Sequence, residues 1–259
     1  MDYNYIKNSA IGAAYAAGKI LRSHIGRLER IEKKGPEDLV TSADLASEKH
    51  ILEFLKDRFP DHDVLAEESG GGIKGKTGCL WIIDPLDGTT NFAHQVPIYS
   101  VSIAFAKDGV LKAAVVLNPA TGELFSAVAG KGAALNGNPA TVSRCRKLSE
   151  SLLVTGFPYD VKRDTAPYMK RFEQCLKAAR GIRRLGSAAL DLCFVACGRF
   201  EGFWEENLKP WDTAAGTLIA REAGALVTDF SQQPFEPDKK EILATNGLIH
   251  QELSSTLKL

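Results

Sequence analysis

The sequence predicts an α+β fold in which an antiparallel sheet is followed by a mixed sheet, with helices interleaved between them. Two segments with helical spacing of apolar residues come first, and residues 64–142 then consist of short β-rich runs separated by short turns. After about residue 151, strands and helices alternate. No segment has the composition of a linker, so residues 1–150 and 151–259 are expected to form two halves of one compact unit.

Two amphipathic helices are expected to cover a sheet near the start of the chain. The first is predicted over residues 5–28, where apolar side chains recur with a period close to that of an α-helix. The second is predicted over residues 44–59, with Pro60 just beyond its end. The sheet-facing side of this second helix is expected to carry Leu45, Leu52, Leu55 and Phe59.

The remaining elements are predicted from β-rich runs and from apolar periodicity. Short turns such as Lys107-Asp108-Gly109 join the strands of the first half, which indicates an antiparallel meander. In the second half, helices are expected over residues 165–179, 187–197 and 212–223. The helix at 187–197 is apolar on nearly every side, which is typical of a helix buried between two layers.

Composition and charge exclude several classes of protein. Hydrophobic residues make up 44% and charged residues 25% of the 259 residues, as in ordinary globular domains. The 32 basic and 32 acidic residues cancel, so dedicated nucleic-acid binding is not expected and a small-molecule partner is favoured. No apolar run approaches the roughly 20 residues of a membrane span. Five scattered cysteines without a Cys-x-x-Cys pair favour a reducing cytoplasm over a disulfide framework.

The segment WIIDPLDGTTNF, residues 81–92, places two acids where a buried strand reaches the surface. Pro85 biases Asp84 toward an extended backbone, which fixes its carboxylate at the end of the strand. Gly88 permits a positive φ or a close backbone approach. A helical turn that begins at Thr89 would present free N–H groups, which bind anions and phosphate above all.

Two acids beside an anion site repel the anion unless a cation lies between them. Carboxylates such as Asp84 and Asp87, together with a turn carbonyl such as that of Leu86, are hard oxygen donors that suit Mg²⁺ or Mn²⁺ better than zinc. The segment therefore predicts a site for a metal ion and a phosphate. The alternative from the residues alone is an acidic turn followed by a capped helix.

Acidic residues at the end of another predicted strand and at the start of a predicted helix also favour the metal site. Glu67 and Glu68 follow a short apolar strand, and Asp212 lies at the start of a predicted helix. Each has a local explanation, because acidic pairs are common in solvated loops and an aspartate at a helix N-terminus is favoured by the helix dipole. Three such ends in one chain indicate a shared site more strongly than any one of them.

Four segments together resemble the inositol monophosphatase family: DLVTSAD (38–44), EES (67–69), DPLDGTTNF (84–92) and WDTAAG (211–216). They follow the order of the family and cover about residues 30–245. The resemblance implies the layered αβαβα sandwich of the sugar-phosphatase type, shared with fructose-bisphosphatase-like, lithium-sensitive phosphatases. It also favours a homodimer.

The resemblance implies roles for individual residues. Two or three Mg²⁺ ions, or Mn²⁺ as the alternative, would be held by Glu67, Asp84, Asp87, Asp212 and the carbonyl of Leu86. Catalysis would involve Asp44, Glu67 and Thr89, with Asp44 and Thr89 activating the attacking water, although Asp44 could also merely favour the start of its helix. The implied substrate contacts are Asp87, Gly88, Thr89, Thr90, Ala189, Glu205 and Arg184.

The residues after Glu205 depart from the family's pattern of Glu, apolar, Gly, because the chain reads Glu205-Glu206-Asn207. This departure leaves the role of Glu205 open. The adjacent Arg183 is expected to be solvated, whereas for Arg184 two interpretations stay open: a contact with a second phosphate or a nucleotide, or a solvated side chain.

The implied function is Mg²⁺-dependent hydrolysis of inositol 1-phosphate or a similar small polyol or sugar phosphate. The alternatives are fructose 1,6-bisphosphatase or a dual activity, followed by phosphatases for 3′-phosphoadenosine 5′-phosphate or histidinol phosphate. A different class of hypothesis is a scaffold or partner of the RNA machinery. Four converging carboxylates argue against that class as the sole role.

Overall fold

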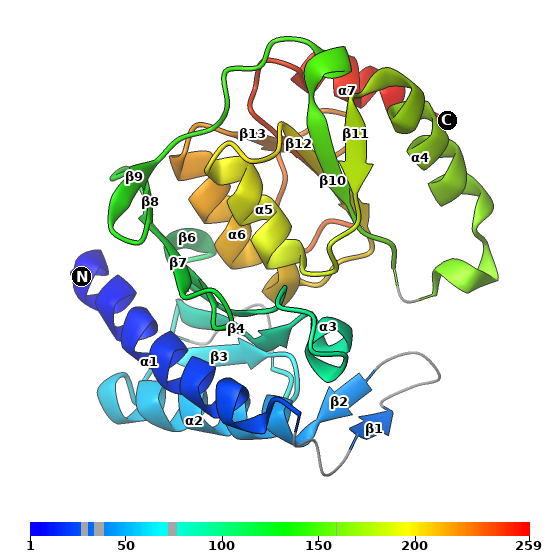
Figure 1. Cartoon of the computed structure of the whole chain (residues 1–259). Coiled ribbons are helices and arrows are strands. Elements are labelled where there is room, and N and C mark those ends of the chain that lie inside the picture. The colour runs from blue at the N-terminus through cyan, green and yellow to red at the C-terminus, as the bar shows by residue number, and fades with distance from the viewer. Residues whose placement is uncertain (27–30, 34–38, 72–76, 159) are drawn as a thin grey trace.

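The computed structural model describes residues 1–26, 31–33, 39–71, 77–158 and 160–259, and it has five layers. Helices α1 (Tyr3–His24) and α2 (Ser42–Arg58) cover the outer face of the first sheet (Figure 1). Helices α5 (Ala188–Ala196) and α6 (Pro210–Glu222) lie between the two sheets. Helices α4 (Ala166–Ala178) and α7 (His250–Thr256) cover the second sheet. The predicted αβαβα arrangement is confirmed.

The end of α1 and the start of α2 are each set by the local backbone and side chains, and both lie within a few residues of the predicted bounds. Helix α1 ends at His24 because Ile25 is extended and Gly26 has a φ of 69°. Helix α2 begins two residues before the prediction because Thr41 caps it. The Thr41 hydroxyl accepts the N–H groups of Ala43 and Asp44, and the Asp44 carboxylate accepts the N–H of Thr41, which is a capping box.

The first sheet has the order β3-β4-β5-β6-β7-β8-β9. Its strands are β3 (Asp63–Ala66), β4 (Cys79–Asp87), β5 (Ser100–Lys107), β6 (Val110–Asn118), β7 (Glu123–Val128), β8 (Ala133–Leu135) and β9 (Asn138–Ala140). Strands β4 to β9 form the predicted antiparallel meander, but β3 pairs with β4 in parallel. The prediction of a wholly antiparallel first sheet is therefore wrong. Strand β3 ends at Ala66 and β4 begins at Cys79, a separation in sequence long enough for a parallel connection, which a short turn cannot provide.

The second sheet has the order β11-β10-β12-β14-β13 and is mixed, as predicted. Strand β10 runs parallel to β11 and β12, and β14 runs antiparallel to β12 and β13. The strands are β10 (Leu152–Thr155), β11 (Gly181–Arg183), β12 (Gly202–Glu206), β13 (Leu226–Thr228) and β14 (Glu241–Thr245). A two-stranded ribbon of β1 (Ile31–Lys33) and β2 (Leu39–Thr41), the short helix α3 (Thr89–Ala93) and the 3₁₀ turns Leu148–Glu150 and Val161–Arg163 complete the fold.

The buried face of α2 differs from the prediction. Leu45 is 53% exposed, whereas Asp44, Ser47 and Glu48 are buried together with Ile51. The expected face is therefore wrong at Leu45. Polar side chains occupy core-facing positions of this helix because they form hydrogen bonds at the candidate site described below.

Three apolar clusters separate the layers, and the middle one contains α5 and α6. Every residue of α5 is buried, as predicted for its apolar sequence. The two helices approach closely at Gly216 of α6, which has no Cβ; a Cβ there would lie only 2.7 Å from the Cβ of Leu192. Among the described helices, none is long and apolar enough to cross a membrane.

Candidate active site

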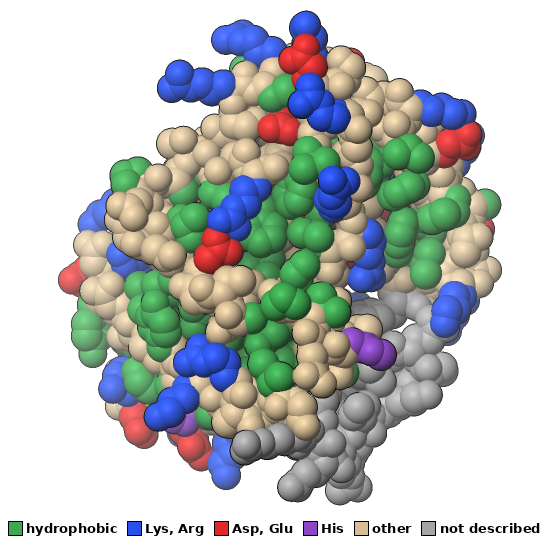
Figure 2. Space-filling model, viewed as in Figure 1, with side chains coloured by type: hydrophobic (Ala, Val, Ile, Leu, Met, Phe, Trp, Pro, Cys, Tyr) green, Lys and Arg blue, Asp and Glu red, His purple; other side chains and the backbone are tan. Residues whose placement is uncertain are grey.

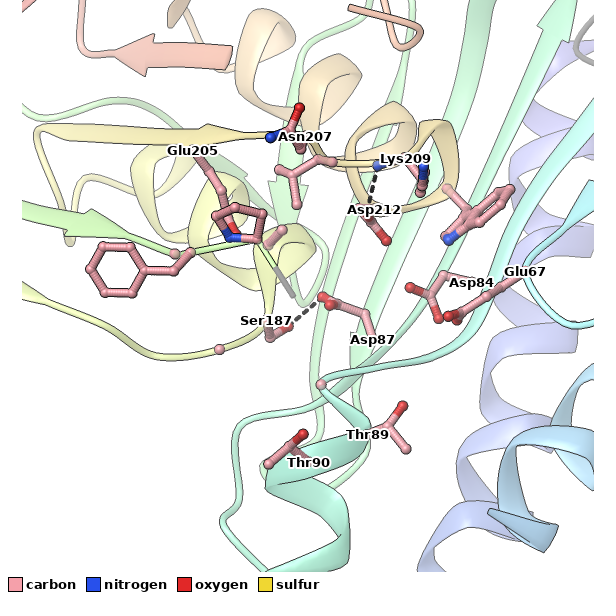
Figure 3. Close-up of a pocket in the computed structure, with 18 of the residues that line it drawn as sticks. Glu67, Asp84, Asp87, Thr89, Thr90, Ser187, Glu205, Asn207, Lys209 and Asp212 are labelled. Carbon is pink, nitrogen blue, oxygen red and sulfur yellow. Dashed lines mark hydrogen bonds between the residues drawn. The ribbon is translucent and has the colours of Figure 1, made fainter. Parts of the chain in front are cut away.

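One cavity of about 270 Å³ lies where the first sheet, α3, α6 and the loops of the second half meet. Figure 3 shows the acidic side chains that project into it. The cavity is lined by Glu67, Asp84, Leu86, Asp87 and Asp212, and also by Gly88, Thr89, Thr90, Arg184 and Glu205. All five predicted metal ligands therefore meet at one place, although they come from three different elements.

The end of β4 directs both of its aspartates toward this cavity. The pairing of β4 with β5 changes register between Asp84 and Asp87, which face Ser102 and Ser100. Such a bulge re-aims side chains that would otherwise follow the regular alternation of a strand. The Leu86 N–H donates to Oδ1 of Asp84 at 2.9 Å, which holds that carboxylate in a turn.

Asp212 comes from the opposite half, in the first turn of α6. Its Oδ2 accepts the N–H of Lys209 at 2.7 Å, and Pro210 occupies the first helical position. Pro suits this position because its missing N–H would have no partner inside the helix. The capping hydrogen bond thus orients the carboxylate toward the cavity, as Figure 3 shows.

Helix α2 forms hydrogen bonds with the backbone next to Asp84 and next to Glu67. The Ser47 hydroxyl donates to the carbonyl of Pro85 at 2.9 Å. The Glu48 carboxylate accepts the N–H groups of Glu68 and Ser69, each at 2.8 Å. Sequence reasoning missed Ser47 and Glu48. The available signal was their spacing from Asp44, which puts three polar side chains on one buried helix face.

Asp44 does not line the cavity, but its carboxylate accepts a hydrogen bond from Thr89, which does. The Thr89 hydroxyl is 3.1 Å from Oδ1 of Asp44 and 3.1 Å from the carbonyl of Leu86. Gly88 makes this turn possible because its φ is 93° and a Cβ there would lie 3.0 Å from the carbonyl of Ile98. Helix α3 starts at Thr89, as predicted.

Burial raises the pKa values of Asp84, Asp87 and Asp212 in the cavity, and for Asp84 and Asp212 neighbouring carboxylates add to the shift. Burial raises the pKa of Asp84 well above its usual range, and the carboxylates of Glu67, Asp87 and Asp212 raise it further. Burial likewise raises the pKa of Asp212, with the Lys209 N–H opposing and neighbouring acids adding to the shift. Burial raises the pKa of Asp87 to about 6, against hydrogen bonds led by that of Ser187. These carboxylates can be ionised together only if a cation accompanies them.

The donor set fits a hard divalent cation. Oδ1 of Asp84 and Oδ2 of Asp212 each accept a backbone N–H, and the second oxygen of each carboxylate accepts no hydrogen bond from the described residues. Within the described ranges, no three His, Cys, Asp or Glu side chains already stand at metal-binding spacing. Single carboxylate oxygens suit Mg²⁺, which keeps several waters and seldom occupies an all-protein cage.

The substrate side of the cavity is formed by the second half. Glu205, near the end of β12, lies against Gly156, where a Cβ would be only 2.1 Å from Oε2 of Glu205. Burial raises the pKa of Glu205 to about 8, with the Arg184 guanidinium opposing and Asp87 adding to the shift. Arg184 lies over Gly186 and lines the cavity. Arg183 is exposed and is absent from the lining, as expected for a solvated side chain.

The sequence matches the profile of the inositol monophosphatase family over residues 2–258. The chain belongs to the inositol monophosphatase family. It is 47% identical to the inositol-1-monophosphatase of Synechocystis sp. over 96% of this chain and 87% of that protein. It is 43% identical to Nus factor SuhB of Pseudomonas aeruginosa over 97% of this chain and 95% of that protein. The inositol monophosphatase structure from Anabaena matches with a TM-score of 0.89 and 43% identity, covering 98% of this chain and 95% of that one.

Membership of the inositol monophosphatase family confirms the resemblance, the fold class and the phosphatase class expected from the sequence. The family is generally metal-dependent, in agreement with the acidic cavity. The roles assigned to Asp44, Glu67, Asp84, Asp87 and Asp212 stay predictions that their geometry supports.

The departure from the pattern of the inositol monophosphatase family after Glu205 has a structural explanation. Glu206 points away from the cavity and pairs with Arg171 of α4 at 2.8 Å. Asn207 lines the cavity with a φ of 62°, a left-handed conformation that glycine adopts freely and asparagine tolerates better than most residues. The pocket wall of this family member therefore carries an amide where the pattern has no side chain.

Ala189 differs from the contact that the family resemblance implies. Its side chain is buried, and its N–H donates to Oδ2 of Asp87 at 3.0 Å. The cavity wall at this point is formed by Gly186, Ser187 and Ala188. A substrate contact at Ala189 stays a prediction, whereas the hydrogen bond from its N–H to Asp87 is present in the structure.

The raised pKa of Glu205 predicts how stability depends on pH when metals are chelated. Between the ordinary pKa of 4.5 and the folded value of about 8, folded Glu205 holds a proton that the unfolded chain has lost. Stability must therefore fall as pH rises through this window. We expect the Tm in EDTA to fall between about pH 6.5 and 8.5, by roughly 2–4 °C for each kcal/mol lost.

The matched variant for this expectation is Glu205→Gln, which keeps the size of the side chain and cannot ionise. Its Tm is expected to change less over the same interval, as measured by calorimetry in EDTA. Burial lowers the pKa of His250, so this residue makes stability rise with pH. That rise is confined to pH values below about 6.5, the ordinary pKa of histidine, and lies outside the interval tested. Equal slopes for the wild type and Glu205→Gln would show that Glu205 does not hold the proton.

Proposed function

We propose that this phosphatase uses Mg²⁺ to hydrolyse inositol 1-phosphate or a similar small polyol or sugar phosphate. The observation that carries the proposal is the convergence of Glu67, Asp84, Asp87 and Asp212 with the start of α3 on one small cavity. Its volume of about 270 Å³ lies just below the roughly 300–1,000 Å³ usual for ligand pockets, so it suits a small ligand rather than a large one.

The ligands proposed for two or three ions are the four carboxylates together with the carbonyl of Leu86, and Mn²⁺ is the alternative ion. Bound ions would lower the pKa of the attacking water and neutralise the developing charge of the phosphate and its leaving oxygen. Gly88, Thr89 and Thr90 lie at the same wall and would contact the phosphate. Glu205, Asn207 and Arg184 would contact the remainder of the substrate.

The protein would supply the proton acceptor through Thr89 and Asp44. The Thr89 hydroxyl can donate to Oδ1 of Asp44 or to the carbonyl of Leu86, and Thr89 itself lines the cavity. A water aligned there could pass a proton to Thr89 as Thr89 passes its own proton to Asp44. Burial raises the pKa of Asp44, against hydrogen bonds from Thr41 and Thr89, which favours an acceptor over a permanently ionised acid.

The experiment that tests the proposal is phosphate release from a panel of monoesters with Mg²⁺, with Mn²⁺ and with EDTA. The panel contains inositol 1-phosphate, fructose 1,6-bisphosphate, 3′-phosphoadenosine 5′-phosphate and histidinol phosphate. We expect the highest kcat/KM with inositol 1-phosphate, no release in EDTA, and inhibition by Li⁺. A higher value for another ester would reassign the substrate, and release that persists in EDTA would overturn the metal proposal.

A second candidate function is a role in the RNA machinery, because a relative of similar length is named Nus factor SuhB. Lys and Arg side chains are spread out on the face shown in Figure 2, and the 32 basic and 32 acidic residues of the chain cancel, so a protein contact is favoured over direct nucleic-acid binding. Pull-down with RNA-polymerase components tests this role. Retention by a catalytically inactive variant would separate binding from catalysis, whereas no retention of either form would remove the candidate.

We also propose a homodimer, a cytoplasmic location and a boundary between the two halves near residue 150. The dimer is supported by apolar side chains at the surface of α4, where Met169 is 43% and Leu176 is 53% exposed. The cytoplasmic location is supported by five cysteines that are all free thiols. Light scattering of the purified chain would measure the oligomeric state.

A further inference from the structure

The carboxylate of Asp87 is held by three hydrogen bonds that all reach the same oxygen. Oδ2 accepts from the hydroxyl of Ser100 at 3.3 Å, from the hydroxyl of Ser187 at 2.5 Å and from the N–H of Ala189 at 3.0 Å. Ser100 and Ser187 are fully buried, and Figure 3 shows the bond from Ser187. A carboxylate oxygen has about two lone-pair sites, so three donors leave Oδ2 no capacity for a further ligand.

The donors come from both halves of the molecule. Ser100 is the β5 residue that faces Asp87 across the sheet, whereas Ser187 and Ala189 belong to the start of α5. The bond between Ser187 and Asp87 therefore joins residues 100 positions apart in the chain. The orientation of Asp87 depends on how the first sheet and α5 are placed relative to each other.

Ser187 behaves unlike an ordinary serine at the start of a helix. A serine at the N-cap normally accepts an N–H of its own first turn, as Thr41 does for α2. Ser187 is the N-cap of α5, but its side chain makes no capping bond. Its hydroxyl donates to Asp87 instead, and the carboxylate of Asp87 accepts the N–H of Ala189 that a serine cap would accept. Ser187 therefore does not cap its own helix, and its hydroxyl contacts the candidate metal ligand Asp87.

We propose that Ser187 and Ser100 are positioning residues that commit Oδ2 of Asp87 to the protein, so that Asp87 binds metal through Oδ1 alone. The inference rests on the proposed metal site. Oδ1 accepts none of these three hydrogen bonds, so it is the oxygen left for a cation. Fixing one oxygen prevents the carboxylate from rotating or from chelating a single ion through both oxygens, and it lowers the ordering cost of ion binding.

The experiment measures Mn²⁺ affinity by electron paramagnetic resonance, together with kcat and KM, for the full-length protein. Loss of such supporting hydrogen bonds usually weakens metal binding by about 10–100-fold. We expect Ser187→Ala to raise the Kd for Mn²⁺ within this range and Ser100→Ala, whose bond is longer, to raise it less. Ser187→Thr keeps the hydroxyl and is expected to restore most of the affinity. The Mg²⁺ concentration for half-maximal activity should rise in parallel.

The matched control is Ser254→Ala, which removes a buried hydroxyl on α7 that donates to the carbonyl of Phe230 at 3.0 Å, far from the cavity. It is expected to lower Tm without changing Mn²⁺ affinity. Unchanged or tighter Mn²⁺ binding in both Ser187→Ala and Ser100→Ala would overturn the inference, because the bonds would then be neutral or would restrain Asp87 from the ion. Absence of Mn²⁺ binding in the wild type would instead overturn the proposed metal site.

If Ser187→Ala does not fold, Ser100→Ala decides the question. Ser100→Ala leaves the α5 contacts of Asp87 in place and removes only the bond from β5. A Kd for Ser100→Ala equal to that of the wild type would then contradict a positioning role for the serine pair, whereas Ser187→Thr, which keeps the donating hydroxyl, is expected to bind Mn²⁺ nearly as the wild type does.

Discussion

Asp84→Asn is expected to lower kcat for phosphate release by about 10³-fold or more. Bound ions supply several kcal/mol of stabilisation to the transition state, and each 1.36 kcal/mol corresponds to a factor of ten in rate. Asparagine has nearly the same shape and its carbonyl oxygen can still accept the N–H of Leu86, so the turn at the end of β4 should persist. The substitution removes the charge and leaves the backbone in place.

The same substitution is expected to stabilise the protein in EDTA. The Asp84 carboxyl is buried, and the acids of Glu67, Asp87 and Asp212 raise its pKa well above its usual range. Removing this charge relieves repulsion that only a cation otherwise offsets. We therefore expect the Tm of Asp84→Asn in EDTA to exceed that of the wild type, by about 2–4 °C for each kcal/mol relieved.

Calorimetry with EDTA and with Mg²⁺ checks this pair of effects. The wild type should gain more Tm on adding Mg²⁺ than Asp84→Asn does, because ligand binding stabilises the folded state only where the site is intact. Asp63→Asn is a useful control, since Asp63 lies at the other end of β3 and outside the cavity lining. Near-normal turnover by Asp84→Asn would place the metal site elsewhere.

The positions of the acids could be predicted because each follows a readable local pattern. Asp84 follows the apolar run of β4, Glu67 directly follows β3, and Asp212 lies in the first turn of a helix that begins with a proline. Strand ends and helix starts bring backbone and side-chain polar groups to the same edge of a layered fold. The family resemblance then indicated which of these ends meet, which local patterns alone could not decide.

The residues that hold the acids were not predictable in the same way. Ser187 and Ser100 contact Asp87 across 100 and 13 positions of sequence, and Glu48 contacts Glu68 across 20. Their types are common in loops and helices, so only the tertiary arrangement distinguishes them. The polar residues Asp44, Ser47 and Glu48 share one face of α2, which could have indicated a buried polar cluster. The prediction instead assigned the buried face to an apolar set that included Leu45, which is exposed.

Strand β3 shows the corresponding limit for the fold. The short turns of the first half correctly predicted the meander of β4 to β9, because a turn of a few residues can only reverse the chain. Strands β3 and β4 are separated by a longer stretch of sequence, which permits either a parallel or an antiparallel neighbour. Pairing of β3 with β4 in parallel was therefore not readable from strand composition.

Asp44→Asn is expected to lower kcat by about 10²–10⁴-fold, the usual worth of a general base. The effect comes from a reversed hydrogen bond. The Thr41 N–H requires an acceptor from residue 44, so the asparagine oxygen would face Thr41 and its NH₂ group would face Thr89. The Thr89 hydroxyl would then accept from residue 44 and could no longer pass a proton to it.

A double-mutant comparison separates this proton path from a simple loss of helix capping. Thr89→Ala removes the hydroxyl and leaves the capping box of α2 intact, so its Tm should stay close to that of the wild type while kcat falls by a similar factor. Groups that act as one unit are strongly non-additive. The double variant Asp44→Asn with Thr89→Ala should therefore be about as slow as the slower single variant. A loss equal to the product of the two single losses would mean that Asp44 and Thr89 act independently, and the route from Thr89 to Asp44 would have to be abandoned.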